Sequence, residues 1–127
     1  MTNDETMPLY RPVGQKELDL IRQSGWQSFP PRLDWQPIFY PVLSEEYAVK
    51  IARDWNTKDP NSGHAGYVLR FKVRKQFIDQ FEPHEAGGRA LQEYWIPSER
   101  LDEFNANIVG TIDILHEFRG EEKKRQP

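Results

Sequence analysis

The sequence predicts an α+β domain built from short, mainly antiparallel strands with two short helices in its N-terminal half. The order of expected elements is strand, helix, strand, helix and then mostly strands, which is typical of this fold class. The strands are short and bounded by proline or glycine. The chain has 127 residues and no cysteine, so it is long enough to bury a core without disulfides and has no thiolate ligands for a metal.

Charge and domain organisation are simple. The net charge is -3 with both signs mixed along the chain, which gives no general case for nucleic acid or a membrane as partner. Residues 1–6 are polar and acidic, and no apolar run reaches membrane-spanning length, so we expect a cytoplasmic protein. We expect a flexible N-terminus at 1–6, one domain at 7–118 and a disordered charged tail at 119–127.

The first expected elements are a strand and a helix. Residues 7–13 are short, apolar and interrupted by prolines, which fits a strand with unpaired ends. Residues 15–24 carry Leu18 and Ile21 three positions apart, and Gly25 follows where a C-terminal cap belongs. We therefore expect a short amphipathic helix directly after the first strand.

The second strand and helix follow a proline-rich loop at residues 30–37. Residues 38–40 are expected to form a short strand. Ser44 is a good N-cap for a helix over 45–55, which has acidic residues in its first turn. The apolar stripe expected on this helix consists of Ala48, Ile51, Ala52 and Trp55.

The C-terminal half is mainly strands. Residues 67–73 alternate apolar and basic side chains, which predicts a half-buried strand. One helical turn is expected at 77–81, a small helix at 98–104 and a closing strand at 108–115. A stripe of basic residues lies on the strand at 67–73 and just after it, and consists of Arg70, Lys72, Arg74 and Lys75. We expect it to be a solvated face of the sheet, or else to attract a phosphate-rich ligand.

Glu93 lies within an apolar and aromatic segment, 90–97, that we expect to be one strand. Side chains alternate along a strand, so Leu91, Glu93 and Trp95 should share a face. A carboxylate between two large apolar groups fits an edge strand with one face in water. It also fits a carboxylate at the mouth of a pocket, although edge-strand glutamates are the commoner case.

Three blocks of this sequence together carry a family resemblance. The first is Leu-Tyr-Arg at 9–11 with the helix that ends at Gly25. The second is Pro-Ile-Phe-Tyr at 37–40 with the helix through Ala48, and the third is Glu-Tyr-Trp-Ile-Pro at 93–97. In this order the blocks resemble those of ADP-ribosyltransferases. The chain also resembles small bacterial proteins labelled ADP-ribosylation/crystallin-like.

The resemblance, which covers residues 8–118, implies a split ADP-ribosyltransferase-like sheet and NAD as a substrate. Cleavage of the nicotinamide–ribose bond passes through an oxocarbenium-like state, which a carboxylate stabilises. By the resemblance Glu93 has this catalytic role, in ADP-ribosyl transfer or in NAD glycohydrolysis. The residues that it assigns to NAD binding are Arg11, Tyr10, Phe39 and Tyr40.

The blocks also depart from the family pattern. Residues 39–41 read Phe-Tyr-Pro where the branch with arginine on the first strand has Ser-Thr-Ser, and the branch with tyrosine there has histidine in place of Arg11. Leu91 stands where arginine-modifying enzymes have Gln or Glu, which disfavours that acceptor. The acceptor therefore stays open among protein, nucleic acid, a small molecule and water. The alternative is a catalytically degenerate copy that binds a nucleotide, a nucleic-acid end or a partner protein.

No metal site is predicted. The chain has three histidines, and their positions lack ligand spacing.

Overall fold

A computed structural model describes residues 5–85, 87 and 91–120. Its main sheet contains β1 (Thr6–Val13), β3 (Ala65–Arg74) and β7 (Ile108–Arg119), in the antiparallel order β1-β3-β7. The strand β3 is central and alternates as predicted in its second half, where Arg70 and Lys72 are exposed. Its first half is buried on both faces.

The sheet continues beyond β1 through a single residue, Val42. Its N–H and C=O bond to Tyr10 over 2.8 and 2.9 Å, and Val42 also bridges to Glu93. Glu93 belongs to β5 (Gln92–Glu93), which pairs with β4 (His84–Glu85). In space the order is therefore β4, β5, Val42, β1, β3 and β7.

The segment expected as one strand is in fact two. After β5 the chain leaves the sheet and forms β6 (Ile96–Pro97), which pairs with β2 (Ile38–Phe39). The same pair of chain segments thus meets twice, because residues 38–43 run antiparallel to residues 92–97. Residue 90 of the expected strand lies outside the described residues.

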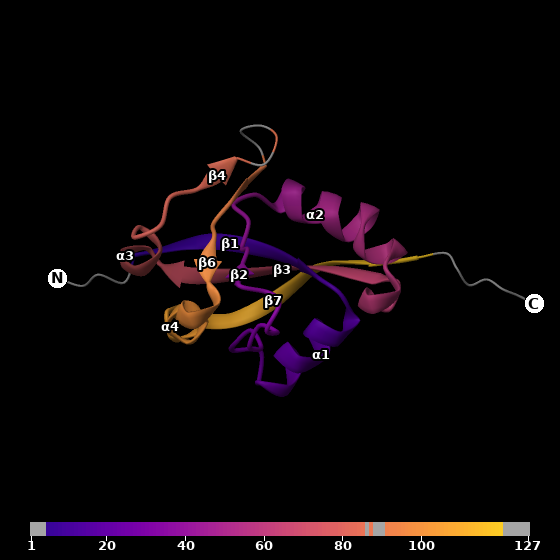
Figure 1. Cartoon of the computed structure of the whole chain (residues 1–127), viewed down its shortest axis with the longest axis horizontal. Helices are drawn as coiled ribbons and strands as arrows, with labels where there is room; N and C mark the ends of the chain where they lie inside the picture. The colour runs from indigo at the N-terminus through magenta and orange to yellow at the C-terminus, as the bar shows by residue number, and fades with distance from the viewer. Residues whose placement is uncertain (1–4, 86, 88–90, 121–127) are drawn as a thin grey trace, which may run out of the picture.

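Helices cover both faces of the main sheet. The helix α2 (Glu45–Asp54) lies on one face, and α1 (Gln15–Gln23) and α4 (Leu101–Ala106) lie on the other (Figure 1). The helical turn α3 (Lys75–Ile78) follows β3. The short 3₁₀ turns are Asn56–Lys58, Pro60–Ser62 and Ser98–Arg100.

Local signals account for the helix ends. The hydroxyl of Ser44 accepts a hydrogen bond from the backbone N–H of Tyr47 over 3.1 Å, as an N-cap does. Gly25 has φ +79° just after α1, a conformation that glycine adopts at low cost. The prediction for Trp55 was wrong: the helix ends at Asp54, and Trp55 is 70% exposed.

The core lies between the sheet and the α1 and α4 side. Its centre is a group of phenylalanine rings with centroids 4.9–6.4 Å apart, namely Phe29, Phe39, Phe71 and Phe104. A smaller cluster on the other face packs α2 against the sheet and contains Val42, Ala48, Ala52 and Val68. A Cβ on Gly66 would lie 2.3 Å from the Ala52 carbonyl oxygen, so glycine permits this close approach.

The ends of the domain differ slightly from expectation. Thr6 already belongs to β1, and β7 runs on to Arg119 instead of ending near residue 115. Residues 1–4 and 121–127, expected to be flexible, lie outside the described residues. None of the described helices is both long and apolar enough to span a membrane.

Candidate functional site

Glu93 is the last residue of β5, and its half-buried carboxylate is held by two side chains. The hydroxyl of Tyr47, in the first turn of α2, donates to Oε1 over 2.9 Å. The indole Nε1 of Trp95 donates to Oε2 over 2.9 Å, so Glu93 and Trp95 share a side as predicted. Within the described part of the chain, each oxygen accepts one side-chain hydrogen bond, which leaves it a second lone pair. The two bonds orient the carboxylate, and the described residues do not use all of its lone pairs.

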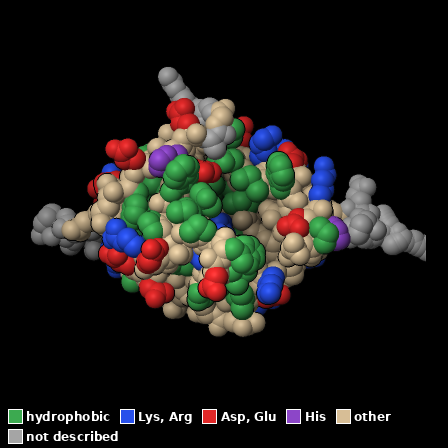
Figure 2. Space-filling view, viewed as in Figure 1, with side chains coloured by type: hydrophobic (Ala, Val, Ile, Leu, Met, Phe, Trp, Pro, Cys, Tyr) green, Lys and Arg blue, Asp and Glu red, His purple; other side chains and the backbone are tan. Residues whose placement is uncertain are grey.

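Trp95, which bonds this carboxylate, is packed against two further rings. Trp95 stacks on the ring of His84, with centroids 3.8 Å apart and planes 7° apart. It also meets Tyr40 edge to face, at 6.4 Å and 85°. Trp95 and Tyr40 are both exposed. Figure 2 shows hydrophobic side chains gathered on this face of the molecule, over β2 and β6. The surface beside Glu93 therefore offers flat rings on which a planar group can stack.

Arg11 is buried in a closed ion pair. Its Nε and Nη2 donate to the two carboxylate oxygens of Glu17 over 2.7 and 3.0 Å. Its Nη1 donates to the carbonyl of Tyr40 over 3.3 Å. The guanidinium lies 4.5 Å from the centroid of the Phe39 ring. This bidentate pair has the geometry of a structural contact between β1 and α1.

The predicted site residues divide between the two faces of the sheet. Tyr10, Val42 and Glu93 are successive pairing partners, so their side chains share the face that carries α2. Arg11 follows Tyr10 and points to the opposite face, where Glu17 and the core lie. The structure therefore does not bring Arg11 and Glu93 into direct contact.

The remaining aromatic predictions also separate. Phe39 has no exposed surface and belongs to the core, which leaves Tyr40 as the exposed member of that pair. Tyr40 joins the two halves of the site, since its carbonyl contacts Arg11 and its ring contacts Trp95. Tyr10 is partly buried against the α2 cluster, on the Glu93 side.

The edge of β1 is open beyond Tyr10. Among the described residues, Val42 is the bridge partner of β1 on this side, and the pairing involves Tyr10 alone. Two positions later Pro12 lacks an N–H, so this ladder cannot continue there. Among the described residues, no strand therefore pairs with β1 on this side beyond Tyr10, next to Arg11 and Tyr40.

Sequence reasoning missed two polar residues of the site. The contact of Tyr47 with Glu93 could not be predicted from the sequence, because it depends on how α2 packs beside β5 in the folded chain. Arg32, in the proline-rich loop, lies 5.8 Å above the same Phe39 ring as Arg11. The sequence offered one indication that Arg32 has a fixed position: it follows Pro30 and Pro31, which restrict the backbone.

Tyr47 reports on the Glu93 carboxylate through its own titration. Burial, and then the hydrogen bond to Glu93, raise the pKa of Tyr47 to about 12. A raised tyrosine pKa means that the folded state holds the proton more tightly. The stability that it contributes is present below the ordinary pKa of 10.0 and is lost as the pH rises through about 12.

We expect Glu93→Gln to lower the pKa of Tyr47 while leaving it above 10.0, because burial is the larger cause. The measurement is the pH dependence of the Tyr47 ring carbon signal in NMR. Tyr94 is the internal control, since burial raises its pKa without a contribution from Glu93. An unchanged Tyr47 titration would contradict the hydrogen bond.

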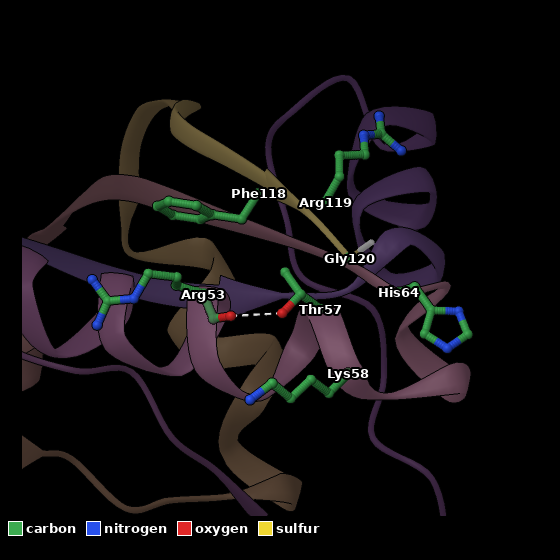
Figure 3. A pocket seen from close by; sticks show the side chains of 7 residues that line it. All are labelled: Arg53, Thr57, Lys58, His64, Phe118, Arg119 and Gly120. Carbon is green, nitrogen blue, oxygen red and sulfur yellow. Dashed lines mark hydrogen bonds between the residues drawn. The ribbon is translucent and has the colours of Figure 1, made fainter. Parts of the chain in front are cut away.

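A separate pocket of about 640 Å³ lies between the end of α2 and the end of β7 (Figure 3). Its lining residues are Arg53, Thr57, Lys58, His64, Phe118, Arg119 and Gly120. The basic side chains point away from one another, and the guanidinium groups of Arg53 and Arg119 are paired with Asp54 and Glu117. The pocket therefore lacks convergent donors. Within the described part of the chain, no three His, Asp or Glu residues are grouped as metal ligands.

The fold and the site define an α+β protein with antiparallel sheets and an oriented surface carboxylate beside aromatic rings. Comparison of the chain with protein-family models, with curated proteins and with solved structures gave no match.

Proposed function

We propose that this protein cleaves NAD between nicotinamide and ribose and transfers ADP-ribose to an acceptor or to water. The observation that carries the proposal is the Glu93 carboxylate, which Tyr47 and Trp95 hold beside exposed rings and on which the described residues leave lone pairs unused. The bond that breaks joins the ribose C1′ to the pyridinium nitrogen, and its electron pair leaves with nicotinamide. The sugar becomes cationic, and the acceptor supplies the electron pair of the new bond.

Glu93 suits this reaction because its negative charge opposes the developing positive charge. A carboxylate oriented before the reaction needs no rearrangement as the cation forms. Its free lone pairs would accept a hydrogen bond from a ribose hydroxyl. Tyr40 and Trp95 would stack against the nicotinamide ring. Nicotinamide becomes neutral when the bond breaks, and an apolar surface favours the neutral form.

The strand arrangement also supports the proposal. The three blocks that resemble ADP-ribosyltransferases are neighbours in space, since Tyr10, Val42 and Glu93 are paired in succession. We therefore propose that the sheet is a split ADP-ribosyltransferase-like sheet that opens at β1, where pairing stops after Tyr10. NAD would enter at this edge. Arg11 would hold its ribose or phosphate oxygens with the N–H groups that Glu17 leaves free.

A second candidate function is nucleotide binding without turnover. The bidentate pair of Arg11 with Glu17, and the location of Arg11 on the face opposite Glu93, favour this reading. An arginine already satisfied by a carboxylate stabilises the fold whether or not NAD is present. In this case Tyr40 and Trp95 would bind the ring of a nucleotide and Glu93 would accept hydrogen bonds from its ribose.

The test combines NAD binding, followed by calorimetry, with nicotinamide release, followed by chromatography, on the purified chain. We expect both binding and release, with release occurring even without an added acceptor because water can take its place. Binding of NAD without release, with protein and nucleic-acid acceptors also supplied, would favour the second candidate. Absence of binding would overturn both.

A further inference from the structure

We propose that Arg32, together with Arg11, forms a binding site for a phosphate group, and that it takes the pyrophosphate of the nucleotide. This inference rests on the proposed function for the identity of the ligand. The site lies on the α1 side of the open β1 edge. The sequence motifs do not include Arg32.

Two guanidinium groups meet at one aromatic ring here. Arg11 lies 4.5 Å and Arg32 lies 5.8 Å from the centroid of Phe39. Burial is the larger cause, and the positive charge of Arg11 the next, that lowers the pKa of Arg32. Only one carboxylate, Glu17, forms an ion pair with either of them in the described structure. The cluster therefore carries an excess positive charge that an anion would neutralise.

Arg32 also has a donor without an acceptor. Its Nε is buried and has no hydrogen-bond partner among the described residues. A buried N–H normally has a partner, and an unpaired one points to a missing acceptor. By contrast, the Nε of Arg11 is fully used by Glu17. Of the two arginines, Arg32 is thus the one whose Nε donor is left unused by the described residues.

A phosphate suits these donors better than a carboxylate does. Its oxygens are distributed around phosphorus, so one group can accept from two guanidinium forks that approach from different directions. The loop that carries Arg32 is stiffened by its prolines and by a bond from the Leu33 N–H to Gln36 Oε1 over 3.0 Å. Little ordering of the protein is then needed when the anion binds. Tyr40, which contacts both Arg11 and Trp95, connects this site to Glu93.

The test measures binding of inorganic pyrophosphate and of ADP to the full chain by calorimetry. We expect Arg32→Gln to weaken both by about tenfold or more, the usual effect of losing a charge-assisted hydrogen bond. Arg32→Lys should recover only part of the loss because it lacks the Nε donor. The matched control is Arg53→Gln, an exposed arginine in the last turn of α2 that is paired with Asp54, which should bind as the unaltered chain does.

A second measurement identifies the atom. The Nε–H signal of Arg32 in nitrogen-15 NMR should shift on titration with pyrophosphate, as an orphaned donor gains an acceptor. Equal binding by Arg32→Gln, or no binding of pyrophosphate and ADP by the unaltered chain, would overturn the phosphate site even if NAD is cleaved. Pyrophosphate binding that depends on Arg32 in a chain that does not cleave NAD would support the site while refuting the enzymatic proposal.

Discussion

Glu93→Gln is expected to slow nicotinamide release from NAD by about 100- to 1,000-fold, the usual effect of removing one preorganised electrostatic group. The substitution removes the negative charge that opposes the oxocarbenium-like state and keeps the size of the side chain. NAD binding should change far less than the rate, because the charge matters most when the sugar becomes cationic. The measurement is the rate of nicotinamide release at saturating NAD.

The control for this variant is Glu85→Gln on the neighbouring strand β4. Glu85 is exposed, and the strand alternation directs it to the face opposite His84 and Glu93. Its rate should match that of the unaltered chain. In Glu93→Gln, the amide faces either Tyr47 or Trp95 with an N–H, so folding is checked by circular dichroism. A folded Glu93→Gln chain with an undiminished rate would exclude Glu93 from the reaction.

Glu17→Gln is expected to lower the free energy of unfolding by about 3 kcal/mol, since it leaves Arg11 buried without its counter-charge. The side chains of Arg11 and Glu17 are 10% and 22% exposed, so water compensates little. The amide offers one oxygen in place of two and presents an N–H to the guanidinium. Chemical denaturation of both chains measures the difference.

Glu82→Gln is the matched control, because Glu82 is exposed and should leave the stability within about 0.5 kcal/mol of the original. If Glu17→Gln proved equally mild, the ion pair would not be structural. Arg11 would then be free to bind an anion. The Arg11–Glu17 pair would no longer favour nucleotide binding without turnover. A large loss of stability would show that the main role of Arg11 is to stabilise the fold.

The sequence by itself determined the features that depend on near neighbours in the chain. The cap at Ser44, the positive φ at Gly25 and the alternation around Arg70 all follow from short-range hydrogen bonding and strand geometry. The α+β class and the antiparallel sheets follow from the order of such elements. The side chains of Glu93 and Trp95 do meet through a hydrogen bond, although the single strand from which this was predicted is interrupted after Glu93.

Only the tertiary structure decided which distant residues meet. The single bridge at Val42 sets the register between β1 and β5, and a register shift of one residue would exchange the faces of Glu93 and its neighbours. That register separates Arg11 from Glu93 and brings Tyr47 to the carboxylate. Core packing around Phe39 likewise brings Arg32 to Arg11. These contacts span many residues, and their formation depends on how the whole core packs, which local patterns do not record.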